Sequence, residues 1–270
     1  MEIRHGGEVC TPTAPKTRQT LALLLFRANQ AVDTSAVIDE LWCDNPPRSS
    51  MTTMQTYIYQ LRKLFSRVTG EDTQQKILVS QPPGYCLRIS EDQLDAKVFE
   101  RLATEGRELL ATGHVEQASR KLHEALKLWR GRTLADVSAG RLLEGHIVHL
   151  EELRITTLEL RCHADLQLGA HRELVPELRS LVTEYPLNEW FHGQLITALH
   201  HAGRRGEALQ AYQNLRRVLD TELGIEPSIA LQSLQRDLLA EPRLPASSRA
   251  GRPLSLRGPA AGSNGRASAA

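Results

Sequence analysis

The stretch Ser49–Phe65, SSMTTMQTYIYQLRKLF, predicts an amphipathic helix that contains no acidic residue. The opposite sides of this helix differ in character when successive residues are placed 100° apart. One side carries hydroxyl groups, an amide and cations, but no carboxylate. Exposed helix faces normally mix acids with bases, so a face without acids favours a polyanionic partner over a plain solvated surface. The other side is the apolar face of a helix packed on a core, formed by Met54, Ile58, Leu61 and Phe65.

The polar residues of this helix divide by what they can offer to double-stranded DNA. Threonine and glutamine can reach base edges in a major groove, and threonine also offers a methyl group to thymine. Tyrosine, arginine and lysine further along suit phosphate groups, which position a protein without reading the sequence. The helix therefore supplies these candidate DNA contacts: Thr52, Thr53, Thr56, Tyr59, Gln60, Arg62, Lys63 and Arg67.

The segments before this helix predict a small hairpin and two further helices. Residues 2–11 contain a central Gly-Gly pair between short runs with strand character, which predicts a hairpin. A helix opens at Pro15, because proline is favoured in the first helical turn. Thr34 or Ser35 is expected to cap a short helix over residues 36–42.

The segments after the amphipathic helix predict a second hairpin, here called the wing. Residues 76–79 and 85–89 have strand character and are joined by a Pro-Pro-Gly turn, in which Gly84 is expected to adopt a conformation closed to other residues. Strands, three helices and a hairpin predict a winged helix-turn-helix domain over residues 1–90. The wing would lie over a minor groove or the DNA backbone, and it adds two candidate DNA contacts, Gln81 and Arg88.

Residues 95–240 predict helices throughout and contain an internal repeat. Gly169 and Gly203 stand 34 residues apart with matching residues downstream, and Gly113 begins a third copy before an irregular insert. Pairs of antiparallel helices at this period are typical of tetratricopeptide-like stacking, in which neighbouring units bury each other's apolar faces. The expected fold class is therefore mainly α: a winged helix-turn-helix domain (α+β) followed by an all-α tetratricopeptide-like domain. The last segment, 242–270, is rich in Pro, Gly, Ser, Ala and Arg and predicts a disordered tail.

The chain carries no recognisable signature of an enzyme, a metal site or a membrane protein. Its four cysteines lie far apart, with no pair at zinc-binding spacing. We find no phosphate-binding loop, nucleophile elbow or carboxylate constellation, so we expect no enzyme activity, no cofactor and no metal. There is no run of about 18 apolar residues and no signal peptide, so we expect a cytoplasmic protein without membrane contact.

Several motifs follow one another in a fixed order along the chain. They are Pro15-Lys16-x-Arg18-Gln19, Ile38-Asp39-Glu40-Leu41-Trp42, Thr56-Tyr57-Ile58-Tyr59-Gln60-Leu61-Arg62-Lys63-Leu64, Pro82-Pro83-Gly84-Tyr85 and Leu223-Gly224-Ile225-Glu226-Pro227-Ser228. Together they resemble the Streptomyces antibiotic regulatory protein family, and the resemblance covers about residues 15–240. It implies an OmpR-type DNA-binding domain followed by a bacterial transcriptional activation domain, as in the small members without an ATPase module.

The resemblance also implies a function and partners. Family members activate transcription by binding direct repeats near the −35 element of biosynthetic gene-cluster promoters and recruiting RNA polymerase holoenzyme through its sigma and alpha subunits. Residues 50–68 would be the recognition helix and 76–89 the wing. A homodimer on DNA, a repressor in place of an activator, and a helical-repeat scaffold for other proteins stay open as alternatives. The loop before the recognition helix would contact sigma region 4 through Cys43, Asp44, Asn45 and Arg48.

Overall fold

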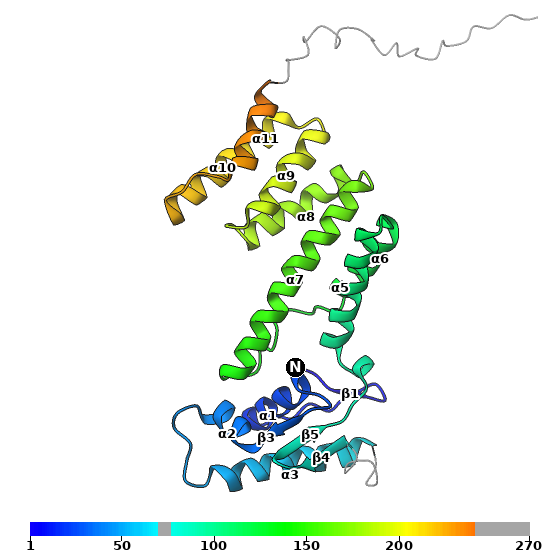
Figure 1. The fold of residues 1–270 in the computed structure, drawn as a ribbon, viewed down its shortest axis with the longest axis vertical. Helices are drawn as coiled ribbons and strands as arrows, with labels where there is room; N and C mark the ends of the chain where they lie inside the picture. Colours follow the sequence, from blue (N-terminus) through cyan, green and yellow to red (C-terminus); the bar gives the residue numbers. More distant parts are fainter. Residues whose placement is uncertain (70–76, 241–270) are drawn as a thin grey trace, which may run out of the picture.

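The computed structural model describes residues 1–69 and 77–240, which form a winged-helix domain and a helical domain (Figure 1). The winged-helix domain lies at one end of an elongated molecule, and pairs of helices extend away from it. This arrangement confirms the predicted fold class. The predicted tail, 242–270, and the first residue of the predicted strand 76–79 lie outside the described residues.

The winged-helix domain contains the three predicted helices and one strand that was not predicted. Its elements are β1 (Arg4–His5), β2 (Glu8–Val9), α1 (Pro15–Phe26), β3 (Ala31–Asp33), α2 (Thr34–Trp42), α3 (Ser50–Thr69), β4 (Leu78–Gln81) and β5 (Gly84–Leu87). Strands β1 and β2 form the predicted N-terminal hairpin. The additional strand, β3, pairs antiparallel with β5, so the wing is part of a three-stranded sheet in the order β3-β5-β4.

The apolar face of α3 is the part of the helix that attaches it to the rest of the domain. Met54 and Leu61 are fully buried and Ile58 is 2% exposed, as the helical periodicity predicts. Phe65, predicted on the same face, is half-buried at the edge of the same cluster. Complete burial of a side chain of this size contributes about 1.5–3 kcal/mol, so these residues fix the orientation of α3.

The predicted N-cap of α2 was wrong by one residue. Asp33, not Thr34 or Ser35, caps the helix: its carboxylate accepts hydrogen bonds from the Ser35 backbone N–H at 2.8 Å and from the Ser35 hydroxyl at 2.7 Å. These bonds lower the pKa of Asp33. The cap lies earlier than expected because β3, which the sequence pattern did not indicate, ends at Asp33 and runs directly into α2.

The expected conformation of Gly84 was also wrong. Gly84 is the first residue of β5 and does not adopt the left-handed backbone conformation. Position 84 needs a residue without a side chain for a different reason. A Cβ atom there would lie 1.9 Å from the carbonyl oxygen of Val32 in β3. The glycine therefore permits the close approach of β3, a strand that is distant in the sequence.

The helical domain consists of three helix pairs and a final helix. A 3-10 turn, η1 (Glu91–Gln93), leads into the domain. The elements that follow are α5 (Asp95–Ala111), α6 (Val115–Leu126), α7 (Arg141–Gln167), α8 (His171–Glu184), α9 (Glu189–His201), α10 (Arg205–Leu223) and α11 (Ile229–Ala240). The long helix α7 extends from the winged-helix domain into the middle of the stack (Figure 1).

Each of the three repeated glycines ends the first helix of one helix pair, and all three do so in the same way. Gly113, Gly169 and Gly203 have φ angles of 80°, 86° and 75°, in the left-handed region. Each glycine donates its N–H to the carbonyl three residues earlier, and the next residue donates to the carbonyl five residues earlier. This is the Schellman ending of a helix, in which glycine takes the position that a side chain would strain. The repeated glycines thus mark one turn structure, used three times.

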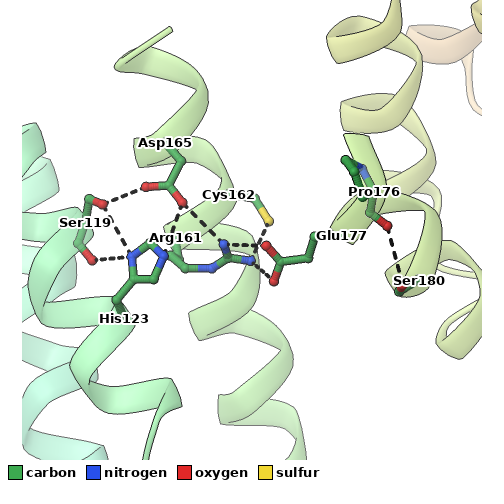
Figure 2. Close-up of polar contacts among 8 residues, drawn as sticks. All are labelled: Ser119, His123, Arg161, Cys162, Asp165, Pro176, Glu177 and Ser180. Atoms are coloured by element: carbon green, nitrogen blue, oxygen red, sulfur yellow. Dashed lines mark hydrogen bonds and ion pairs between the residues drawn. The ribbon is translucent and has the colours of Figure 1, made fainter. Parts of the chain in front are cut away.

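A buried polar cluster joins the first helix pair to the second (Figure 2). Arg161 of α7 is 2% exposed, and its guanidinium donates to Glu177 of α8 at 2.6 and 2.8 Å and to Asp165 at 3.3 Å. Asp165 also accepts a 2.6 Å hydrogen bond from the hydroxyl of Ser119 in α6. Burial alone would lower the pKa of Arg161, but the neighbouring Cys162, Glu177 and Asp165 outweigh it and raise the pKa. The guanidinium therefore stays charged and ties three helices together.

Two further features of the described residues bear on possible functions. No helix within 1–69 and 77–240 is long and apolar enough to cross a membrane, and no group of three or more metal-ligating side chains comes together there. The four cysteines are free thiols, of which Cys86 and Cys162 are buried.

Candidate nucleic-acid interface

Helix α3 presents most of its predicted DNA contacts to solvent. Its first turn has no acidic residue and its last turn carries Arg67. Tyr59 is 64% exposed. The remaining candidates on α3 divide into exposed side chains, Thr52, Thr56, Gln60, Lys63 and Arg67, and half-buried ones, Thr53 and Arg62.

Two of the candidate base contacts are already oriented by hydrogen bonds within the domain. The Thr56 hydroxyl donates to the backbone carbonyl of Thr52 at 3.0 Å, which leaves its oxygen and methyl group facing outward. The amide oxygen of Gln60 accepts a 2.6 Å hydrogen bond from the hydroxyl of Thr17, a buried residue of α1. The amide NH₂ of Gln60 is then the end left for another partner.

The cations Lys63 and Arg67 of α3 have no acidic partner among the residues that the structure describes. Both side chains are exposed. Arg18 of α1, in contrast, pairs with Asp136 at 3.0 Å. Unpaired cations on an acid-free helix face are free to neutralise phosphate groups.

Arg62 has a different position from the other cations of α3. Its Nε donates to the carbonyl of Leu78 at 3.2 Å and its Nη2 donates to the hydroxyl of Ser80 at 2.9 Å, both in β4. Its guanidinium also lies over the ring of Tyr85 in β5, 5.9 Å from the ring centre. Arg62, a predicted phosphate contact, therefore links α3 to the wing.

The structure separates the two predicted contacts of the wing. Gln81 is exposed beside the Pro82-Pro83 turn and pairs with Gly84. Arg88 is exposed at the other end of the hairpin, where its backbone N–H donates to Ile77 at 2.7 Å. Four residues of strand separate the two ends by about 13 Å, so the two side chains start from opposite ends of the hairpin.

The loop between α2 and α3 is exposed, and aromatic side chains pack where it joins the two helices. The predicted polymerase contacts Cys43, Asp44, Asn45 and Arg48 are all exposed. Cys43 has a positive φ of 51°, which is uncommon for a residue other than glycine. Beneath the loop, the rings of Trp42 and Tyr57 stack with their centres 6.4 Å apart. The stack ties the end of α2 to α3 under the loop.

Sequence patterns alone did not reveal two residues that hold this surface in place. The Thr17 hydroxyl orients Gln60, and the Thr34 hydroxyl donates to the carbonyl of Pro83 at 3.0 Å, which holds the wing turn against α2. These partners lie 43 and 49 residues apart in the chain. No periodicity within one helix could indicate such pairs, because each pair forms only when elements distant in the chain pack together.

Comparisons with known proteins match both domains. The family model described as bacterial transcriptional activator domain matches residues 94–239, and the model described as transcriptional regulatory protein, C terminal, matches residues 8–87. Regulatory protein DnrI of Streptomyces peucetius is 41% identical over 238 residues, which cover 87% of this chain and 88% of that protein. Transcriptional regulator RedD of Streptomyces coelicolor is 34% identical over 228 residues, which cover 84% of this chain and 65% of RedD.

A solved structure shares the arrangement of the two domains. The structure of Mycobacterium tuberculosis EmbR in complex with a low-affinity phosphopeptide superposes with a TM-score of 0.80 at 32% identity, and the match covers 86% of this chain and 61% of the EmbR chain. Three findings agree with one another: a winged-helix domain whose helix α3 carries no acidic residue, a helical domain that matches the activator-domain model, and relatives over almost the whole chain. The chain belongs to the Streptomyces antibiotic regulatory protein family of transcriptional regulators, and it has the two domains of the small members.

Proposed function

We propose that this protein is a sequence-specific activator that binds direct repeats near the −35 element of promoters in a biosynthetic gene cluster. The observation that carries the proposal is the outward face of α3, where Lys63 and Arg67 are exposed without an acidic partner among the described residues. Thr52, Thr56 and Gln60 on the same helix supply the groups that read base edges.

The proposal assigns different tasks to different parts of the surface. Lys63, Arg67 and Tyr59 contact phosphates, and Gln81 at the tip of the wing approaches the neighbouring minor groove. Arg62 holds the wing at the correct distance from α3 and contributes to DNA binding through that position. Direct repeats would receive one recognition helix each, so we expect two copies of the chain on one promoter.

RNA polymerase is the second proposed partner. The exposed loop from Cys43 to Ser49 directly precedes α3 in the chain, and it would contact sigma region 4 at the adjacent −35 element. The helical domain offers its outer surface to the alpha subunit. Both contacts follow from the family relationship and from the exposure of these segments.

The test is binding and transcription on promoter fragments from the protein's own gene neighbourhood. We expect a sequence-selective mobility shift that weakens steeply with salt, because phosphate contacts release counterions, and a transcript that increases when the protein is added to purified polymerase. A matched fragment with scrambled repeats is the control. Absence of a shift even at low salt would overturn the proposal and favour a helical-repeat scaffold. A shift accompanied by a decrease in transcript would identify a repressor.

A further inference from the structure

The two domains meet where the first turn of α7 enters the winged-helix domain. Leu143 of α7 is fully buried among the core residues of α1, α2 and α3. Two further contacts lie along the same seam: the rings of Phe26 and His146 stack with centres 4.8 Å apart, and Arg18 pairs with Asp136 at 3.0 Å. Helix α7 then continues into the middle of the helical stack (Figure 1), and it carries Arg161 of the buried polar cluster. Its first turn is therefore a buried connection between the two domains.

A single carboxylate of the winged-helix domain caps this turn. Glu40 of α2 is 2% exposed. Its Oε1 accepts the backbone N–H of Gly140 at 2.5 Å, and its Oε2 accepts those of Leu142 at 2.9 Å and Leu143 at 3.2 Å. Gln19 of α1 supports the arrangement by donating its side-chain amide to the Glu40 carbonyl at 2.7 Å and to Oε1 at 3.2 Å.

The capping group has to come from outside α7, because the helix cannot supply its own. The N-cap residue is Gly140, which has no side chain to accept a hydrogen bond from the first turn. The first N–H groups of a helix lack partners within the helix and carry partial positive charge, so they favour a carboxylate. An ionised carboxylate buried without such donors would be strongly unfavourable. Glu40 therefore supplies the hydrogen-bond acceptors that the first turn of α7 lacks, and this turn supplies the donors that the buried carboxylate needs.

The close approach of the two domains also requires a glycine at position 140. A Cβ atom at this position would lie 2.4 Å from the backbone carbonyl oxygen of Glu40 and 2.9 Å from its carboxyl carbon. Backbone atoms of α2 cannot move away without moving the helix. Any side chain at position 140 would therefore push α7 away from α2 and break the hydrogen bonds of Glu40.

We propose that the Glu40–Gly140 contact is a positioning joint, which sets the orientation of the helical domain on the DNA-binding domain and is needed for activation more than for DNA binding. The second half of this inference rests on the proposed function. The DNA-binding face of α3 is expected to remain complete when the joint is broken, since the hydrogen bonds of Thr56, Gln60 and Arg62 go to α3, α1 and β4 and not to α7. A polymerase bound to both domains, however, needs them at a defined angle.

The experiment breaks the joint from each side. Glu40→Gln keeps the shape of the side chain but turns an NH₂ group toward N–H donors, and Gly140→Ala inserts a methyl group from the side of α7. Asp39→Asn, an exposed neighbour on the same helix with the same change of charge, is the matched control. The full chain is used throughout, and three quantities are measured: the small-angle scattering profile, the affinity for the promoter fragment and the transcript made by purified polymerase.

We expect both joint variants to change the scattering profile toward a wider range of domain orientations, and Asp39→Asn to match the wild type. Promoter affinity should stay within about twofold, while the transcript decreases by about fivefold or more, the lower end of a typical coupling between two sites. Unchanged scattering in both variants would overturn the joint, and equal losses of affinity and transcript would overturn its selective role in activation. A wild-type protein that neither binds the promoter nor activates would refute the proposed function, while the scattering result would still decide the joint.

Discussion

Helices α3 and α7 are both long, and one arginine on each, Arg67 on α3 and Arg161 on α7, has a role opposite to the other. On α3, Arg67 is exposed and has no ion-pair partner among the described residues, whereas on α7 Arg161 is 2% exposed and makes hydrogen bonds to Asp165 and Glu177. Arg62 is intermediate, because it lies on α3 with the predicted DNA contacts but donates to β4. The lesson is that the residue type does not assign the role. A cation whose donors are used inside the protein holds the structure, and one whose donors are free is available to a partner.

The most severe test of this contrast is Arg161→Met, which keeps the aliphatic stem and removes the charge. Asp165 is then left buried without its cation, so we expect the free energy of unfolding to decrease by about 3 kcal/mol, the lower end for a broken buried pair, because Glu177 remains accessible to water. Urea denaturation measures the change. Arg179→Met removes an exposed arginine that pairs with Glu207 and should leave the denaturation midpoint almost unchanged.

Arg62→Ala tests the intermediate case. Loss of its hydrogen bonds to Leu78 and Ser80 should reduce the free energy of unfolding by about 2 kcal/mol, since hydrogen bonds from charged groups are stronger than neutral ones. DNA affinity should decrease as well, because the wing is no longer held against α3. If denaturation is unchanged and only DNA affinity decreases, Arg62 is a simple phosphate contact and its assignment as a link is wrong.

Thr56→Ala examines an exposed hydroxyl of α3. We expect the preference for the promoter over unrelated DNA to decrease by about 1 kcal/mol, the lower end for a base contact because threonine cannot bind a base in a bidentate way. Competition binding with single-base variants of the repeat measures this loss. Thr104→Ala is a matched control, since Thr104 makes the same backbone hydrogen bond on α5, at 2.9 Å to Glu100, away from the DNA.

Lys63→Ala should have a smaller and less selective effect. Removing one phosphate contact should weaken binding to specific and random DNA alike and reduce the slope of log affinity against log salt by about 1. Binding measured at several salt concentrations gives the slope. Lys97→Ala removes a lysine paired with Glu100 in the helical domain and should leave the slope unchanged. A promoter-selective loss in Lys63→Ala would contradict its assignment to phosphate.

At neutral pH, the smallest effect concerns a thiol beside Arg161. Burial raises the pKa of Cys162 from its ordinary value near 9 to about 12, so the thiol stays protonated and inert in the folded protein. We expect iodoacetamide to modify Cys43, which is exposed, and to modify Cys162 only after unfolding. A raised pKa in the fold means that stability is complete below about pH 9 and decreases as the pH rises toward 12. Rapid labelling of native Cys162 would show that α7 opens at this point.

Patterns within single helices were sufficient to predict much of this protein. The apolar spacing of Met54, Ile58 and Leu61 predicted which side of α3 is buried, and the repeated glycines predicted the helix pairs. Both signals are local, because helical periodicity and the left-handed conformation of a helix ending depend on residues a few positions apart. The DNA contacts on the outward face stay predictions, and the exposure of Lys63 and Arg67 is compatible with them.

Contacts between distant segments could only be decided by the tertiary structure. Strand β3, the reason for Gly84, the link from Arg62 to the wing and the Glu40 cap on α7 all join residues that are remote in the chain. A glutamate in a short helix has no sequence pattern that distinguishes a solvated side chain from a buried cap 100 residues away. The amino-acid sequence by itself therefore determined the helices, their buried faces and the family. The fold decided which polar groups hold the molecule together and which remain free, because hydrogen-bond partners are chosen by proximity in space.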